Sequence, residues 1–271
     1  MLFPGFELAC IAIVVLALAA MARVRPWRAL LADYAALAIA GWIGEETCVA
    51  WYRFYGYAPA WHGRVDHVPV LIPLIWPLVI LSARAVVDAV APGVGWRRPL
   101  LVGALVAFDA SLVEVIAVRA QLWAWAEPGH LDVPLLGILG WGFFAAAADV
   151  ALGARSRLRH LGLLPALALT HLLIVAAWWG CFRWALRGAL GDASLIGLGV
   201  LSALALLAAW AVRRRGRALP QGVALPRMVA ATLFLITLAV VGPGDGRLWL
   251  HAALVAAPYL VVTDLRAAHH R

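Results

Sequence analysis

The sequence predicts an all-α fold, a polytopic membrane bundle of about nine helices that forms one integral membrane domain over residues 1–271. Hydrophobic residues make up 65% of the chain and charged residues 13%, whereas soluble domains carry about 25% charged residues. The mean hydropathy is +0.92. Apolar runs recur at the length of about 20 residues that spans a bilayer as a helix.

Nine apolar runs give the predicted helices. In chain order they are Phe6–Ala22, Leu30–Trp51, Val68–Val90, Leu100–Trp123, Pro134–Gly153, Leu163–Leu186, Leu195–Val212, Met228–Val241 and Leu248–Thr263. The eighth run is short and is followed by Gly-Pro-Gly-Asp-Gly over residues 242–246. A re-entrant segment and a tight hairpin with the ninth helix both remain open there.

The arginines predict the orientation of this bundle. With nine spans, one set of loops and the C-terminal tail contain fifteen: Arg23, Arg25, Arg28, Arg97, Arg98, Arg155, Arg157, Arg159, Arg213, Arg214, Arg215, Arg217, Arg227, Arg266 and Arg271. The opposite loops contain five: Arg53, Arg64, Arg183, Arg187 and Arg247. Cytoplasmic loops are rich in basic residues. We therefore expect a bacterial inner-membrane protein with its N-terminus outside and its C-terminus in the cytoplasm.

Several classes of partner have no support in the sequence. The net charge is +8, but the arginines occupy short loops between apolar runs and form no nucleic-acid-binding face. No Gly-x-Gly-x-x-Gly or Walker lysine pattern indicates a nucleotide. Cys10, Cys48 and Cys181 lie far apart and form no metal or disulfide pattern. We expect no nucleic-acid partner and no cofactor.

The chain contains a two-helix repeat with one inward carboxylate per copy. The first copy, about residues 40–80, contains Glu46, Tyr55, Tyr57, Pro69 and Trp76. The second, about residues 108–145, contains Glu114, Trp123, Trp125, Pro134 and Trp141. In both, two aromatics follow the glutamate by nine and eleven residues, and a tryptophan follows the proline by seven. The copies are separated by an even number of crossings, so they run parallel and bring both acids toward the outer side.

Four acids lie well inside predicted helices: Glu45, Glu46, Asp109 and Glu114. Ionisable residues within membrane spans are rare and face the bundle interior, so they are candidate catalytic residues. The alternative is that they act as polar contacts that hold helices together. Asp33, Asp149 and Asp264 lie near cytoplasmic helix ends and are interpreted as structural. Arg84 and Asp88, four residues apart, are expected to form an ion pair along one helix.

The aromatic residues of the repeat predict a lining for the same site. We expect Tyr55, Tyr57, Trp76, Trp123, Trp125 and Trp141 to contact a substrate. A desolvated carboxylic acid can act as a Brønsted acid, and aromatic faces attract cations. These two elements suffice to protonate an alkene and stabilise the carbocation that forms.

Metal chemistry has a weaker basis. His62, Asp66 and His67 lie in one outer loop, and His130 and Asp132 in the matching loop. Two histidines and a carboxylate can bind a metal, but no helical His-x-x-x-His pattern occurs, so we expect no metal. The aspartate-rich motif of magnesium-dependent prenyltransferases does not occur either.

Residues 114–125, followed by Asp132-Val133-Pro134 and Gly140-Trp141, resemble the carotenoid biosynthesis protein family, the membrane hydratases of acyclic carotenoids such as bisanhydrobacterioruberin. The region from Glu46 to Trp76 resembles that family's first acidic helix and aromatic turn. The resemblance covers about residues 40–145, and the paired Glu45 and Glu46 are also similar to those of small membrane lycopene cyclases. It implies metal-free, acid-initiated terpenoid chemistry.

The sequence thus favours a membrane enzyme of carotenoid or isoprenoid biosynthesis, a hydratase (a lyase) or a cyclase (an isomerase). Its partners would be a lipophilic isoprenoid, membrane lipid and other carotenoid enzymes. Glu46 or Glu114 would donate a proton to a terminal double bond, and the other acid or Asp109 would orient water or accept a proton. The alternatives are a proton-coupled transporter with its site at the repeat interface and a non-catalytic assembly or lipid-binding protein.

Overall fold

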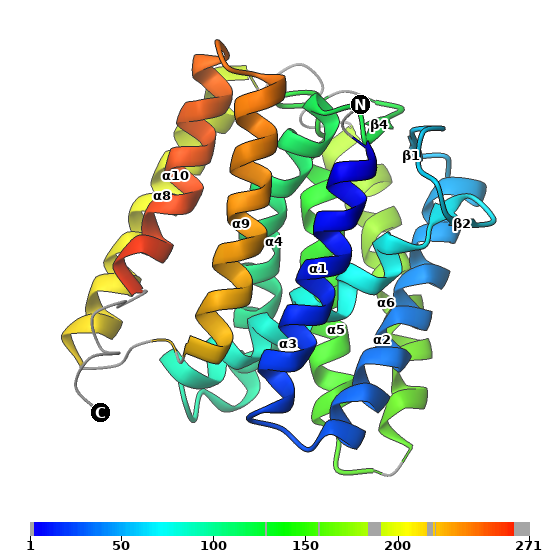
Figure 1. Cartoon of the computed structure of the whole chain (residues 1–271), viewed down its shortest axis with the longest axis vertical. Helices are drawn as coiled ribbons and strands as arrows, with labels where there is room; N and C mark the ends of the chain where they lie inside the picture. Colours follow the sequence, from blue (N-terminus) through cyan, green and yellow to red (C-terminus); the bar gives the residue numbers. More distant parts are fainter. Residues whose placement is uncertain are drawn as a thin grey trace.

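The computed structural model describes residues 3–127, 129–156, 158–183, 191–215, 219 and 221–262. Nine α-helices fall within these residues and run along one common direction (Figure 1). They are α1 (Phe3–Ala22), α2 (Trp27–Glu46), α3 (Leu71–Val90), α4 (Arg98–Arg119), α5 (Leu135–Gly153), α6 (Leu163–Ala177), α8 (Gly191–Arg214), α9 (Gln221–Val241) and α10 (Gly246–Val262).

The predicted all-α membrane bundle is confirmed. Within the described part of the chain, seven helices are long and apolar enough to cross a membrane. The two others are α2, whose charged residues include Asp33 and Glu45, and α10, which has 17 residues. The chain is therefore an integral membrane protein.

The eighth predicted helix is longer than the apolar run suggests. Helix α9 begins at Gln221 and has 21 residues, so it is a full-length helix and not a short re-entrant one. Arg227 ended the predicted span because a charge is costly in a bilayer. In the structure Arg227 is paired with Asp109, and this pairing allows the helix to continue through the arginine.

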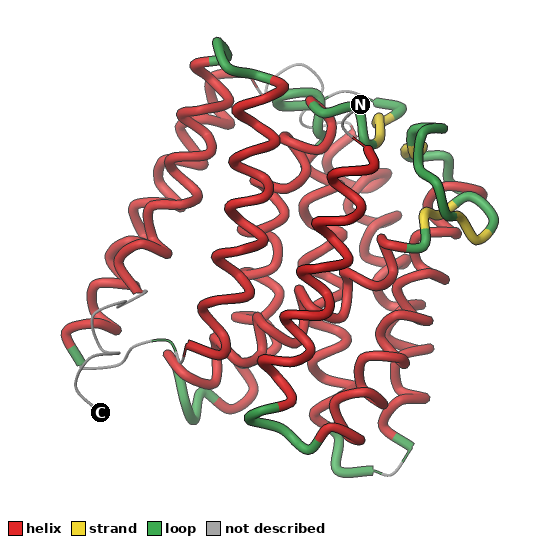
Figure 2. Tube along the Cα trace, viewed as in Figure 1, coloured by secondary structure: helices red, strands yellow, loops and turns green. Residues whose placement is uncertain are grey.

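Short non-helical elements gather at one end of the bundle, near the N-terminus, and we call this the strand end (Figure 2). The strands within the described residues are β1 (Tyr55–Tyr57), β2 (Arg64–Val65), β3 (Val68–Pro69) and β4 (Trp123–Trp125). A π-helical segment, η1 (Thr47–Trp51), continues α2 toward this end, and a second one, η4 (Trp178–Phe182), continues α6. The 3-10 turns η2 (Gly95–Arg97) and η3 (Arg159–Gly162) lie in loops.

Helices α4 and α5 cross at a pair of glycines. A Cβ atom on Gly103 would lie 2.7 Å from the Gly142 carbonyl oxygen, and one on Gly142 would lie 2.9 Å from the Gly103 carbonyl oxygen. Small residues let membrane helices approach until their backbones touch. This contact fixes the position of α4, which carries Asp109 and Glu114, relative to α5, which carries Trp141.

Ion pairs at the opposite end join helices that are distant in sequence. Arg84 binds Asp149 with an N–O distance of 3.0 Å, and Arg98 binds both Asp149 and Asp88. The expected pair of Arg84 with Asp88 is therefore wrong, because the buried Asp149 of α5 lies within reach of Arg84 while Asp88 is exposed. Asp33 binds Arg25, Arg159 and His160. The structural interpretation of Asp33 and Asp149 agrees with these contacts.

Some predicted features lie outside the described residues. They are Asp264, Arg157, Arg187, Arg217, Arg266, Arg271 and the C-terminal ends of the predicted spans Leu163–Leu186 and Leu248–Thr263.

Candidate functional site

The two copies of the repeat meet in a pair of antiparallel strands. Strand β1 pairs with β4 so that Tyr55 faces Trp125, Gly56 faces Ala124 and Tyr57 faces Trp123. In the repeat, Tyr55 corresponds to Trp123 and Tyr57 to Trp125. Tyr55 therefore faces the counterpart of Tyr57, and Tyr57 faces the counterpart of Tyr55, which is the arrangement produced by a two-fold axis. The axis passes between Gly56 and Ala124.

The backbone around these strands follows the same two-fold relation. Ala58 donates to the Leu122 carbonyl at 3.0 Å, and Ala126 donates to the Phe54 carbonyl at 2.8 Å. Left-handed residues also occur in matched positions: Arg53 (φ 54°) with Gln121 (φ 57°), and Asp66 (φ 54°) with Leu131 (φ 50°). Non-glycine residues rarely adopt this conformation. The shared geometry thus extends over both turns of each copy.

Glu114, on α4, is buried beneath three tryptophans. Its Oε2 accepts hydrogen bonds from the indole N–H groups of Trp123 at 2.9 Å and Trp125 at 3.1 Å. Its Oε1 accepts one from Trp141 at 2.8 Å. The side chain belongs to a residue that is 2% exposed. All three predicted aromatic partners therefore converge on this one carboxyl group.

Glu45, near the end of α2, has the corresponding arrangement in the first copy. Its Oε2 accepts hydrogen bonds from the hydroxyls of Tyr55 and Tyr57, the latter at 2.5 Å. Its Oε1 accepts one from the Trp76 indole at 2.7 Å. The rings of Trp76 and Trp141 lie against each other, tilted by 30°, with centroids 4.2 Å apart. The two carboxyl sites are joined through this contact.

The sequence alignment of Glu46 with Glu114 is wrong by one residue, since Glu45 occupies the matching position. The cause is the π-helical segment Thr47–Trp51, which adds a residue between the acid and the strand. Glu45 precedes Tyr55 by ten residues, whereas Glu114 precedes Trp123 by nine. A spacing comparison alone cannot reveal such an insertion.

Glu46 lies outside this site. Its carboxyl group binds His67, whose ring Nδ1 is 2.6 Å away and whose backbone N–H donates at 3.1 Å. His62 pairs with Glu7 of α1 at 2.7 Å. Two of the three loop histidines considered as metal ligands, His62 and His67, therefore each contact a glutamate, whereas His130 stacks on His251. Among the described residues, no group of three metal-ligating side chains gathers at one point.

A cavity of about 470 Å³ reaches both buried glutamates. Asp109 also lines it, and so do all six predicted aromatic residues: Tyr55, Tyr57, Trp76, Trp123, Trp125 and Trp141. The cavity follows one face of α1 from Phe6 to Met21, about 22 Å of helix at 1.5 Å per residue. Most of its other lining is aliphatic. It is therefore a long apolar chamber with Glu45 and Glu114 toward the strand end.

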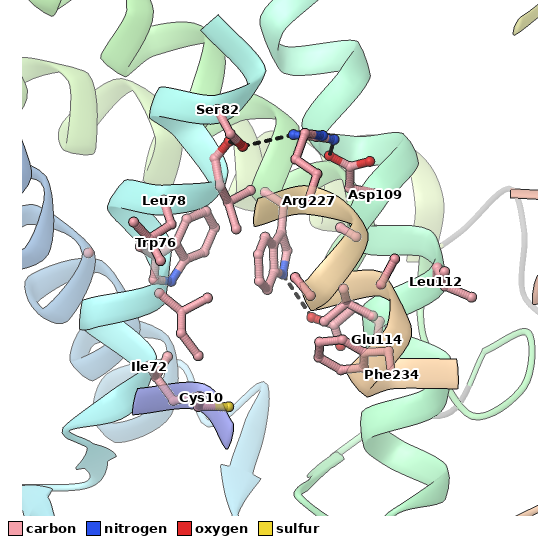
Figure 3. A pocket seen from close by; sticks show the side chains of 18 of the residues that line it. Cys10, Ile72, Trp76, Leu78, Ser82, Asp109, Leu112, Glu114, Arg227 and Phe234 are labelled. Atoms are coloured by element: carbon pink, nitrogen blue, oxygen red, sulfur yellow. Dashed lines mark hydrogen bonds and ion pairs between the residues drawn. The ribbon is translucent and has the colours of Figure 1, made fainter. Parts of the chain in front are cut away.

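Asp109 takes part in a second polar cluster on the cavity wall. Arg227 of α9 pairs with Asp109 and donates to the Ser82 hydroxyl at 2.8 Å (Figure 3). Tyr259 of α10 donates to Asp109 and accepts from Arg227 at 2.8 Å. Sequence reasoning missed Arg227 and Tyr259 because the arginine was assigned to a loop. The position of Arg227 directly before the apolar run was the signal that could have placed it in the helix.

His171 of α6 also lines the cavity. Both of its ring nitrogens are buried and have no hydrogen-bond partner within the described residues. Tyr52 packs edge-on against it, with centroids 5.5 Å apart. Buried polar atoms are normally paired with protein or ordered water. The cavity wall therefore offers one unsatisfied imidazole in addition to the acids.

The site combines buried carboxyl groups, aromatic faces and an apolar chamber. Within the described residues, neither Glu45 nor Glu114 forms an ion pair; their partners are hydroxyl and indole groups. Such a site can give a proton to, or stabilise positive charge on, an apolar molecule. Comparison of the chain with protein-family models, with curated proteins and with solved structures yields no match in any of the three.

Proposed function

We propose that this protein is a membrane enzyme of carotenoid or isoprenoid biosynthesis that adds water to, or cyclises, the end of a long polyene. One observation carries the proposal: an elongated apolar chamber places two buried carboxyl groups among six aromatic side chains. Ligand sites are typically apolar cavities with a few convergent polar groups. The elongated shape and mostly apolar lining of this chamber suit the end segment of an extended polyene.

The chemistry begins with protonation of a terminal double bond by Glu45 or Glu114. The π electrons form the new C–H bond and leave a tertiary carbocation beside the tryptophan and tyrosine rings, whose faces attract cations. In hydration, water adds to the cation and loses a proton to the carboxylate. In cyclisation, a second double bond attacks the cation, and a proton is lost from the ring to the carboxylate. Both routes return the acid to its starting state.

Asp109 has a different part in this proposal. It is bound by Arg227 and Tyr259, and a carboxylate neutralised by a guanidinium is a weak proton donor. We assign Asp109 to holding α4 and α9 together beneath the reacting end. Glu46, which binds His67 at the surface, serves as a control position.

The test is co-expression with a lycopene-producing pathway in bacteria, followed by pigment analysis by liquid chromatography and mass spectrometry. Hydration raises the product mass by one water, and cyclisation leaves it unchanged but shifts the absorption spectrum. Glu45→Gln and Glu114→Gln should each abolish product, whereas Glu46→Gln should retain it. Unchanged pigment with lycopene, shorter acyclic carotenes and acyclic prenyl alcohols would overturn the proposal.

We also infer that the strand end faces the outside of a bacterial inner membrane. The arginine-rich loops lie at the opposite end, and such loops remain in the cytoplasm. The two glutamates then lie toward the outer leaflet. The substrate would enter from the lipid phase, where polyenes dissolve.

A further inference from the structure

The two carboxyl sites have the same geometry but different chemistry. In each, one carboxylate oxygen accepts hydrogen bonds from two strand residues, and the other oxygen accepts one from the tryptophan of the following helix. The strand residues are tyrosines at Glu45 and tryptophans at Glu114. The duplication therefore provides a matched comparison in which hydroxyl groups replace indole groups.

Indole N–H groups can donate hydrogen bonds but cannot accept them. All three partners of Glu114 are indoles. If Glu114 were protonated, its own O–H would find no acceptor among them and would be directed at an apolar wall. Each of the three bonds is strongest when the acceptor is ionised. These three hydrogen bonds thus favour the carboxylate form of Glu114.

Tyrosine hydroxyls both donate and accept. Either tyrosine at Glu45 can therefore rotate its O–H away and accept a hydrogen bond from the protonated acid. Burial raises the pKa of both hydroxyls well above the ordinary value, so they remain protonated. Each hydroxyl can therefore pass on its own proton only while it accepts another. Gly56, between them in β1, is exposed at the strand end. Strand β1 therefore lies at the surface, and its two tyrosines extend from it to Glu45.

We propose that Glu45 is the proton donor of the site, that Glu114 stays ionised to stabilise the carbocation, and that Tyr55 and Tyr57 carry protons between Glu45 and the outer aqueous phase. This inference rests on the proposed function for its catalytic part. The Glu45 carboxyl proton moves to the alkene carbon, and the cation then lies near two carboxylates. The proton released by the added water, or by the closing ring, returns to Glu45 through the tyrosines.

A spectroscopic experiment tests the protonation states without any substrate. Infrared difference spectra of the purified protein in lipid nanodiscs compare Glu45→Gln and Glu114→Gln with the parent chain. Glu45→Gln should remove a C=O stretching band of a protonated carboxylic acid. Glu114→Gln should leave that band and reduce the carboxylate band. A protonated band that disappears with Glu114→Gln, and not with Glu45→Gln, would overturn the assignment.

Kinetics with matched double variants test the proton path. The Tyr55→Phe/Tyr57→Phe variant should lower kcat about a hundredfold, the effect of losing a proton-transfer group, and should enlarge the solvent deuterium isotope effect. The Trp123→Phe/Trp125→Phe variant should lower kcat with no change in the isotope effect. Size-exclusion profiles check that both variants are folded. Equal isotope effects in the two variants would refute the tyrosine path.

The two proposals fail in different ways. If the infrared bands divide as expected but no polyene is converted, the division of protonation states holds and the proposed function falls. If polyenes are converted while the protonated band belongs to Glu114, the proposed function holds, and the assignment of the protonated state to Glu45 is wrong.

Discussion

At the scale of single residues, Gly137 determines whether Trp125 can reach Glu114. A Cβ atom at position 137 would lie 2.8 Å from Cη2 of the Trp125 indole, and nearer still to the neighbouring ring atom. The indole is rigid and is bound to Glu114, so it must leave its position to make room. Gly137→Ala should therefore break that hydrogen bond and lower product formation.

Gly140→Ala, on the same helix, is the matched control. Its Cβ would lie 3.4 Å from Cδ1 of Ile174, at the limit of ordinary contact. Near-parent activity for Gly140→Ala beside a marked loss for Gly137→Ala supports the packing argument. Tryptophan fluorescence and pigment analysis measure the two effects. Equal activity in both variants would contradict it.

Asp109 and Arg227 should behave as one unit. Removing one partner of a fully buried ion pair leaves the other charge unpaired and typically costs about 3–5 kcal/mol, which is an upper limit for this partly buried pair. We expect Asp109→Asn to lower the melting temperature sharply, because Arg227 is then left with only Ser82 and Tyr259. The Asp109→Asn/Arg227→Gln variant should be more stable than Asp109→Asn alone. Strict additivity of the two changes in thermal unfolding would argue against the coupling.

The identity of the first carboxylate shows what residue spacing can and cannot reveal. Spacing located the aromatic partners of both acids, all of which line the cavity. It selected Glu46 over Glu45 because a π-helical residue is invisible in a linear pattern. Spacing along one helix also predicted Asp88 as the ion-pair partner of Arg84, whereas the actual partner, Asp149, lies on a neighbouring helix. Contacts between distant segments depend on helix packing, which a single sequence does not state.

At the scale of elements, the π-helical segment between α2 and β1 offers a direct test of the register. Deleting Val49 from Thr47–Trp51 would make the spacing from Glu45 to Tyr55 nine residues, the spacing found between Glu114 and Trp123. Helix α2 could then continue as a regular α-helix with Glu45 still beside the tyrosine. We expect this deletion variant to fold and to keep part of its activity.

Deletion of Ala38, in the middle of α2, is the control. It rotates every earlier residue of the helix by about 100° at 3.6 residues per turn, and so it turns Asp33 away from Arg159 and His160. Expression level and melting temperature should fall for this variant and remain close to the parent for the Val49 deletion. The reverse order would show that the extra residue is needed for folding.

Helix existence followed from apolar runs, because a chain in lipid must satisfy its backbone within helices. The strands β1 and β4 did not follow, since three-residue strands carry no periodic signal. Their pairing depends on the two copies meeting at the strand end. The length of α9 was also missed, because the cost of Arg227 in the bilayer is offset by a partner on another helix.

At the scale of the whole molecule, orientation decides from which side protons reach Glu45. Arg97 and Arg98 mark the end opposite the strands, and basic loops are held in the cytoplasm. Cysteines introduced at two exposed positions report this directly: Gly63→Cys in the strand-end loop and Trp96→Cys, at a residue that is 75% exposed, at the arginine-rich end. Both are made in a Cys48→Ala/Cys181→Ser background, because Cys181 is exposed and Cys48 is only half-buried.

A membrane-impermeant maleimide added to intact spheroplasts should label Gly63→Cys and leave Trp96→Cys unlabelled until the membrane is opened. The buried Cys10 provides the internal control for intact protein, since it should react only after denaturation. Labelling of Trp96→Cys in intact spheroplasts would invert the orientation and place Tyr55 and Tyr57 at the cytoplasmic face. The proton path to Glu45 would then start from the cytoplasm, while the arrangement of both carboxyl groups within the chamber would be unchanged.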